Sequence, residues 1–392
     1  MVNMEAKFYK VLELDKIIDM LKAKATSSLG LSMIEKLRPM STFEEVKTAQ
    51  EETTEAQSIL INRGHVPLEG IHDIGDKAKR ADLGAVLDPK SLLDLADTMR
   101  ATRVLSNVLS GQIKKETFGN SETSIDEEDD EIKYPIIQSL ATSLYIHKDI
   151  EEEIFNAIIS ELEIADSASP ELRSIRRRIL QKNQSIRSKL NGIISSTTYQ
   201  KYLQDAIISM RGDRFVVPVK AEYRSMMAGI IHDQSSSGAT LFIEPMTIVE
   251  MNNDLRQLKL QEKEEIEKIL ANLSAMVGQV SRELLSNQEI LAKMDFAFAK
   301  GKLSIDMKAT EPDLNQDRLV RIVGGRHPLL DRKSVVANDI ILGGDYSTLL
   351  ITGPNTGGKT VALKTAGLLT LMALSGIPIP ASENSKIGFF EG

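Results

Sequence analysis

Eight consecutive residues carry the clearest chemistry in the sequence. They read Gly353, Pro354, Asn355, Thr356, Gly357, Gly358, Lys359 and Thr360, and they match the phosphate-loop pattern GxxxxGK[ST]. Glycines allow the backbone N–H groups to approach phosphate oxygens closely, and a following helix adds the positive end of its dipole. In such a loop Lys359 reaches the β- and γ-phosphates and Thr360 ligates Mg²⁺. The segment therefore predicts a site for a nucleoside triphosphate with Mg²⁺.

The flanks of this loop have the composition that such a site needs. Residues 347–352 form a short run with a central apolar stretch, which is typical of a buried strand. The pattern of residues 361–374 predicts a helix. Strand, loop and helix follow one another in the required order. A glycine-rich turn without a ligand is the competing interpretation, and the agreement of both flanks disfavours it.

A second candidate site is basic. The whole chain has a net charge of −8, but residues 171–260 hold 14 Lys and Arg against 8 Asp and Glu, so the rest of the chain carries −14. Seven of these cations follow closely on one another: Arg173, Arg176, Arg177, Arg178, Lys182, Arg187 and Lys189. They predict contact with a nucleic-acid backbone; the alternative is the solvated face of a long helix. With no Trp and 4% aromatic residues, base stacking is disfavoured.

The periodicity of apolar residues predicts a mainly α fold. Residues 6–62, 90–110 and 136–164 read as helices, and Ser169 and Pro170 begin another helix, which carries the basic run. Residues 214–219 and 240–243 read as strands within a region rich in turn formers. From Met246 to about Lys300 the spacing predicts one long helix and, with the helix before it, an antiparallel coiled-coil arm. An ordinary helical bundle with a decorated loop is the alternative.

Composition excludes several other classes. There is no cysteine, and the five histidines are scattered, so no metal besides nucleotide-bound Mg²⁺ is expected. The first residues do not resemble a secretory signal and no tract resembles a membrane span, which favours the cytoplasm. The acidic segment 120–131 is interpreted as a solvated connection without a function.

The order of the motifs resembles that of the MutS family of ATPases. The long helix is followed by residues 325–328 (GRHP), then by residues 337–340 (ANDI), and then by the phosphate loop. Residues 211–245 are similar to those of the bacterial second MutS subfamily, which lacks the mismatch-reading domain. The resemblance implies a helical core and first lever arm in residues 1–175, a clamp in 176–242, a returning lever helix in 243–302 and the start of an ABC-type ATPase domain in 303–392.

The resemblance also implies roles for particular residues. It assigns the triphosphate to the phosphate loop, and it aligns Val335 to Asn338 with the segment that packs near adenine. This segment is aliphatic here, where the family often has an aromatic residue. Arg326 and His327 are interpreted as a turn rather than as catalytic residues.

The function implied by the resemblance is that of a homodimeric, ATP-driven nucleic-acid clamp. Such a protein suppresses homologous recombination by binding branched DNA, with endonuclease activity in a C-terminal module. Rescue of stalled ribosomes through rRNA is an open alternative, and a scaffold arm without catalysis is another. Only 18 residues follow the predicted helix 361–374, without a Walker B strand, so we expect a truncated ATPase domain and no hydrolysis by this chain alone.

Overall fold

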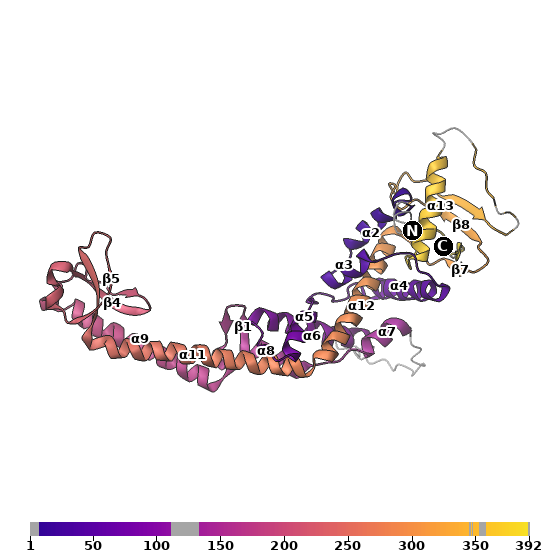
Figure 1. The fold of residues 1–392 in the computed structure, drawn as a ribbon. Coiled ribbons are helices and arrows are strands. Elements are labelled where there is room, and N and C mark those ends of the chain that lie inside the picture. The colour runs from indigo at the N-terminus through magenta and orange to yellow at the C-terminus, as the bar shows by residue number, and fades with distance from the viewer. Residues whose placement is uncertain (1–7, 111–132, 345, 347, 353–357, 391–392) are drawn as a thin grey trace, which may run out of the picture. The chain divides into compact units, whose positions relative to one another are not determined.

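The computed structural model describes residues 8–110, 133–344, 346, 348–352 and 358–390. Within them the chain is mainly α-helical with small sheets, as predicted, and it forms two compact units (Figure 1). Unit 1 comprises Met1–Lys79, Asp94–Glu151 and Val280–Gly392, and unit 2 comprises Arg80–Leu93 and Glu152–Gln279. Three of the four boundaries fall inside α5 (Gly75–Asp82), α6 (Pro89–Leu109) and α8 (Lys148–Ala157), and the fourth lies between Gln279 and Val280. The acidic segment 120–131 lies outside the described residues. None of the helices described is both long and apolar enough to cross a bilayer.

The helical part of unit 1 is built around one helix, α12. The helices that contribute to it are α2 (Leu14–Lys22), α3 (Ser28–Glu35), α4 (Phe43–Arg63), α6, α7 (Pro135–Thr142) and α12 (Ser281–Met307). Phe296 and Leu303 of α12 join the core that α2 and α3 share with the C-terminal sheet. Leu291 and Phe298 of the same helix join a second core with α4, α6 and α7. Because α12 is apolar on both sides, it lies between two cores.

A buried carboxylate joins α12 to the start of α3. Asp295 has no exposed surface, and its oxygens accept hydrogen bonds from the Thr26 and Ser27 amides at 3.0 and 2.8 Å and from the Ser27 hydroxyl at 2.6 Å. The Ser27 hydroxyl in turn accepts from the amide of Gly30 and so caps α3. A Cβ at Gly30 would lie 2.2 Å from the Asp295 carboxylate, which explains the glycine at this point.

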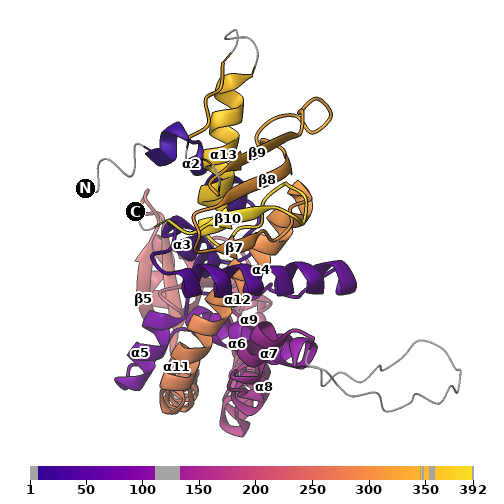
Figure 2. The ribbon, with the colours of Figure 1, turned by 90° about the vertical axis from the view of Figure 1, so that its right-hand side faces the viewer.

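The C-terminal part of unit 1 is a four-stranded sheet covered by one helix. Its strands are β7 (Asp313–Asn315), β8 (Val320–Gly325), β9 (Asn338–Leu342) and β10 (Lys386–Gly388), in the order β7-β10-β8-β9. Only the β7–β10 pair is parallel. Helix α13 (Lys359–Leu374) lies against the sheet (Figure 2). Its residues Leu368 and Leu369 belong to the same core as Ile322 and Ile387. The helix predicted after the phosphate loop is confirmed, with a start two residues earlier.

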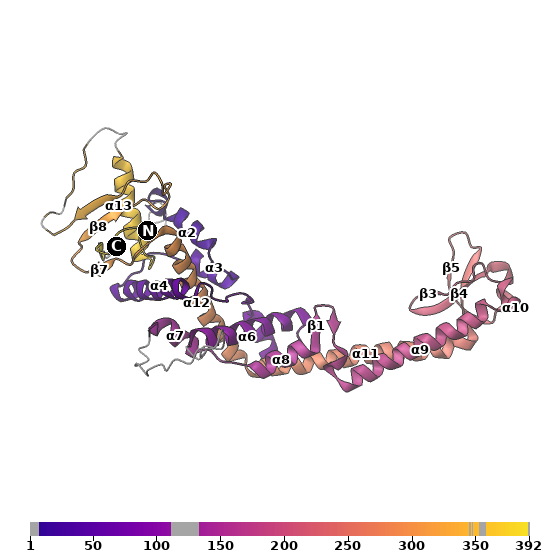
Figure 3. The same cartoon turned by 180° about the vertical axis from the view of Figure 1, so that it is seen from behind.

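Unit 2 contains an antiparallel helix pair, α9 (Pro170–Ile194) and α11 (Met246–Gln279), which Figures 1 and 3 show side by side. Arg176 pairs with Glu262 at 2.8 Å, and further along α9 Lys182 pairs with Asp254 at 2.9 Å. Residue numbers rise in one helix as they fall in the other, so the helices run in opposite directions. The predicted start of α9 is confirmed, because the Ser169 side chain accepts from the Leu172 amide at 2.9 Å and Pro170 opens the helix.

A small antiparallel sheet completes unit 2. It consists of β3 (Ser209–Arg211), β4 (Arg214–Lys220), β6 (Thr240–Pro245) and β5 (Gly229–Gln234), in that order. Two short helical segments, α10 (Thr197–Gln200) and η2 (Ala221–Met226), accompany it, whereas η1 (Asp166–Ala168) directly precedes α9. Phe215, Val217 and Ile243 form its core with Ile186 of α9 and Leu255 of α11. The two predicted strands are β4 and β6.

Two predicted helical stretches are interrupted. Residues 158–164 form a hairpin, β1 (Ile158–Ser160) with β2 (Glu163–Ile164), whose turn leaves Leu162 98% exposed. The predicted helix from Met246 to Lys300 is two helices, because Val280 leaves the helical region with φ −108° and ψ 12°. The apolar spacing continues on both sides of this single residue, so periodicity alone does not reveal the break.

Candidate functional site: a pocket at the start of helix 13 and a basic helix

The phosphate loop is only partly within the described residues. Gly353, Pro354, Asn355, Thr356 and Gly357 lie outside them, while Gly358, Lys359 and Thr360 are described. Gly358 adopts a left-handed conformation, with φ 81° and ψ 7°, and directly precedes α13. Side chains with a Cβ avoid this conformation, so the position requires glycine. The backbone thus enters the helix as the sequence pattern predicts.

A pocket of about 490 Å³ lies at this helix start. Its walls come from the segment between β8 and β9, from residues 351 and 352, and from the first turns of α13. Fourteen residues line it: His327, Leu330, Asp331, Ser334, Val335, Val336, Asn338, Ile351, Thr352, Gly358, Lys359, Val361, Ala362 and Thr365. The structure therefore brings Val335 and Asn338 together with Gly358 and Lys359, although Asn338 and Gly358 are 20 positions apart in the sequence.

The approach to the phosphate loop differs from the prediction. Residues 348–352 do not form a strand, and the side chain of Leu350 is 83% exposed rather than buried. A short apolar run forms a strand only when a neighbouring strand pairs with its backbone. Among the described residues β9 is the strand at one edge of the sheet, and no strand pairs with residues 348–352. Thr360 is exposed in the first turn of α13 and is not among the residues that line the pocket.

His327, which the sequence analysis interpreted as part of a turn, lines the pocket and contacts Glu13, a residue that the sequence does not single out. The His327 ring is 5% exposed, and its Nε2 lies 3.9 Å from Oε2 of Glu13. The same oxygen accepts a hydrogen bond from Nζ of Lys364 at 3.0 Å. Burial lowers the pKa of His327, the nearby lysines lower it further, and Glu13 opposes them. The ring is therefore neutral at pH 7.

The basic residues of α9 include two that already have partners inside unit 2. Arg176 donates from Nε to Glu262 at 2.8 Å and from Nη1 to the carbonyl of Ile164 at 2.7 Å. Lys182 donates to Asp254. These side chains hold the helix pair together, and an external anion would have to compete with a carboxylate for each of them.

The seven cations do not form one stripe. Each residue turns a helix by about 100°, so the run is spread over three sides of α9. Arg173 and Arg177 lie opposite the buried face; Arg178, Lys182 and Lys189 lie on one flank; Arg176 and Arg187 lie on the other, with the Arg187 guanidinium 5.7 Å from the centre of the Phe215 ring. Within the described part of the chain, Arg173, Arg177, Arg178 and Lys189 are exposed and have no acidic partner.

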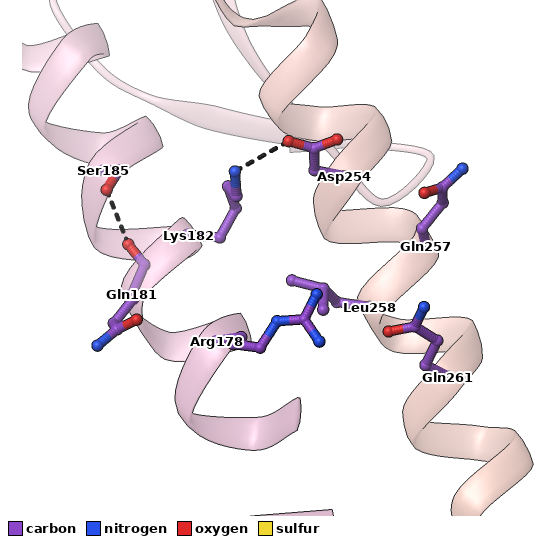
Figure 4. Close-up of a pocket in the computed structure, with 8 residues that line it drawn as sticks. All are labelled: Arg178, Gln181, Lys182, Ser185, Asp254, Gln257, Leu258 and Gln261. Atoms are coloured by element: carbon purple, nitrogen blue, oxygen red, sulfur yellow. Dashed lines mark hydrogen bonds and ion pairs between the residues drawn. The ribbon is translucent and has the colours of Figure 1, made fainter. Parts of the chain in front are cut away.

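A polar groove of about 480 Å³ lies between α9 and α11 beside these residues (Figure 4). It is lined by Arg178, Gln181, Lys182, Ser185, Asp254, Gln257, Leu258 and Gln261. Figure 4 shows Lys182 directed at Asp254 and the Arg178 guanidinium extending from α9 toward α11. A guanidinium and three amide groups can donate several hydrogen bonds to phosphate oxygens. The glutamine amides of the groove therefore add uncharged hydrogen-bond donors beside the cations on this side of α9.

The sheet of unit 2 holds a buried polar network rather than a nucleophile. Glu244 has no exposed surface and accepts hydrogen bonds from Arg214 at 2.9 Å and from Asn252 at 2.7 Å, with His232 Nε2 2.5 Å away. The hydroxyl of Ser235 accepts from the amide of Thr240 at 3.0 Å and so stabilises the turn between β5 and β6. The network satisfies a buried carboxylate and fixes β4, β5 and β6 to α11.

Comparison with known proteins extends over the whole chain. No family model matches it. The Endonuclease MutS2 of Clostridioides difficile (strain 630) is 66% identical over 388 residues, which are 99% of this chain and 47% of that relative. The Endonuclease MutS2 proteins of Alkaliphilus oremlandii and Alkaliphilus metalliredigens are 52% and 48% identical with the same coverage. The chain thus spans about half the length of the curated relatives it matches. On this evidence the chain belongs to the MutS family, in the branch of the MutS2 proteins.

Proposed function

We propose that the pocket at the start of α13 binds ATP with Mg²⁺ and that the chain is the nucleotide-binding part of a MutS-type ATPase. The observation that carries this proposal is the convergence of Val335 and Asn338 with Gly358 and Lys359 on one pocket. A helix N-terminus preceded by a left-handed glycine offers backbone N–H groups to a phosphate. The described residues therefore fit the nucleotide.

The pocket and the rest of the phosphate-loop motif have distinct roles in this proposal. The loop from Gly353 to Gly358 surrounds the β-phosphate, Lys359 neutralises the β- and γ-oxygens, and Thr360 ligates Mg²⁺. Val335 and Asn338 contact the base, with aliphatic packing in place of aromatic stacking. The bound Mg²⁺ supplies charge neutralisation on the phosphates.

Substitution of Lys359 tests the nucleotide site. Lys359→Ala removes the cation that neutralises the β- and γ-phosphates, so the affinity for a fluorescent ATP analogue with Mg²⁺ should fall at least about 100-fold. Equilibrium titration followed by anisotropy measures this effect. The matched control is Lys47→Ala, which removes an exposed lysine that pairs with Glu51 on the same helix. Retained affinity in Lys359→Ala would contradict the assignment.

We further propose that unit 2 binds a nucleic-acid backbone. Its helix α9 presents Arg173, Arg177, Arg178 and Lys189 to solvent, and the groove beside Arg178 adds amide donors. Phosphate contacts of this kind fix orientation without reading sequence. In the whole protein, nucleotide binding and hydrolysis drive a homodimeric clamp that grips branched DNA and suppresses homologous recombination.

The name of the relatives, Endonuclease MutS2, favours DNA as the partner. We place the endonuclease activity in the part of the relatives that this chain does not cover. Competition between a labelled four-way DNA junction and collided ribosomes tests the choice of partner. Preference for the junction supports the proposal, and preference for collided ribosomes would assign the same surface to rRNA. Failure to bind either would leave a scaffold role for the arm.

A further inference from the structure

Glu13 has an unusual backbone and an unusual side-chain direction. It precedes α2 with φ 64° and ψ 25°, a left-handed conformation that costs about 1 kcal/mol or more for a residue other than glycine. Its carboxylate does not cap its own helix. The side chain instead turns inward and is only 18% exposed. The fold therefore holds this carboxylate in a place that the local backbone does not favour.

The carboxylate joins two walls of the nucleotide pocket. Oε2 of Glu13 accepts from Lys364 at 3.0 Å and lies 3.9 Å from Nε2 of His327, and Oε1 accepts from Lys16 at 2.5 Å. Hydrogen bonds from Lys16 and then from Lys364 hold the pKa of Glu13 at about 2, so it is an anion throughout the physiological range. One anion thus contacts the segment before β9 and the helix α13.

His327 is oriented toward this anion by its other ring nitrogen. Nδ1 accepts from the backbone amide of Leu329 at 3.4 Å, which assigns the ring proton to Nε2, the atom that faces Glu13. His327 also lines the pocket together with Lys359. Lys364 lies in α13 between Ala362 and Thr365, which both line the pocket. His327 therefore lines the pocket itself, and Lys364 lies on the helix whose first turns form another wall of it.

We propose that Glu13 is a positioning residue that couples occupancy of the nucleotide pocket to helix α2 of the helical core. This inference rests on the proposed ATP site. A ligand that favours the observed positions of His327 and α13 also favours the contacts of Glu13, and through them the first turn of α2. Coupling of this kind is reciprocal, so loss of the Glu13 contacts must weaken ligand binding.

The test uses Glu13→Gln, which keeps the size of the side chain and removes its charge. The affinity for a fluorescent ATP analogue should fall about fivefold or more, the low end of coupling between sites. In the unsubstituted chain, the analogue should slow amide hydrogen exchange in Leu14–Lys22, and this slowing should be lost in Glu13→Gln. The matched control is Asp19→Asn, an exposed acid of the same helix that pairs with the half-buried Lys22.

A purely structural ion pair would give a different result. Glu13→Gln would then lower the free energy of unfolding in urea, while analogue affinity and ligand-dependent exchange in α2 would match those of the unsubstituted chain. That outcome overturns the coupling and leaves the ATP site intact. If the unsubstituted chain does not bind the analogue, the proposed function fails and the coupling fails with it. Lys364→Gln and the double variant provide a second route, because a shared contact makes their effects on affinity less than additive.

Discussion

At the scale of single residues, Lys300 is a lysine whose ammonium group has no contact with solvent. It lies in α12, and its Nζ is 3.3 Å from the carbonyl of Ala49, 3.9 Å from Glu52 and 4.7 Å from the centre of the Phe296 ring. Burial lowers the pKa of Lys300 to about 8, although Glu52 opposes this shift. Burial also raises the pKa of Glu52, against the effect of Lys300 and Lys293. Desolvation therefore disfavours both charges of this pair.

Lys300 should make the stability of unit 1 depend on alkaline pH. Between the folded pKa of about 8 and the ordinary value of 10.5, the unfolded chain binds a proton that the folded chain does not. The free energy of unfolding should therefore rise with pH across this window, by at most about 1.4 kcal/mol per pH unit from this group. Lys300→Met removes the contribution, so the difference in urea unfolding between the two proteins should change between pH 8 and 10. The control is Lys293→Met, at an exposed position of the same helix, whose free energy of unfolding should depend on pH as that of the unsubstituted chain does. The same pH dependence in Lys300→Met as in the unsubstituted chain would disprove the assignment.

At the scale of elements, two helical glycines of unit 2 have opposite surroundings. A Cβ at Gly278 in α11 would lie 2.7 Å from the carbonyl oxygen of Ala81, whereas a Cβ at Gly192 in α9 would meet nothing within 4 Å. Neither residue has a positive φ. Helix propensity alone favours alanine at both positions by about 0.5–1 kcal/mol. The two positions should therefore differ in stability on substitution because only Gly278 packs against backbone atoms, those of Ala81.

The pair gives a matched prediction. Gly192→Ala should raise the free energy of unfolding by about 0.5–1 kcal/mol, because it adds helix propensity without a clash. Gly278→Ala should lower it by about 1–3 kcal/mol, because the backbone must move to admit the new methyl group. Urea denaturation followed by circular dichroism measures both. An equal gain in the two variants would mean that the close approach at Ala81 has no energetic consequence.

Elements whose signals are local could be predicted from the sequence, and those that need a distant partner could not. The start of α9 follows from Ser169 and Pro170, whose contacts lie within one turn. The apolar run 348–352 resembles a strand, but among the described residues nothing pairs with it. Glu13 gives no local signal at all, because its partner Lys364 is 351 residues away. The predicted phosphate loop gives a local signal, because phosphate binding of this kind requires a fixed spacing of residues.

At the scale of the whole molecule, charge is divided unevenly along the chain. Residues 171–260 carry +6 within a protein of net charge −8. An acidic protein repels nucleic acid over most of its surface, so we expect the proposed binding to come from the region where cations are concentrated. The exposed arginines Arg173, Arg177 and Arg178 are the strongest candidates, because Arg176 and Lys182 are engaged with carboxylates.

The salt dependence of nucleic-acid binding tests whether the cations of residues 171–260 make the phosphate contacts. Each phosphate contact contributes about 0.9 to the slope of log K against log salt concentration for duplex DNA. Changing Arg173, Arg177 and Arg178 to Glu should therefore reduce the slope by about 3 and weaken binding to a four-way junction, as fluorescence anisotropy across a salt series would show. The control changes Lys10, Lys36 and Lys47 to Glu, which alters the net charge equally but outside residues 171–260. If binding depended only on the charge of the whole molecule, the two triple variants would lose affinity equally. A smaller slope in the arginine variant alone would show that nucleic acid contacts α9 directly.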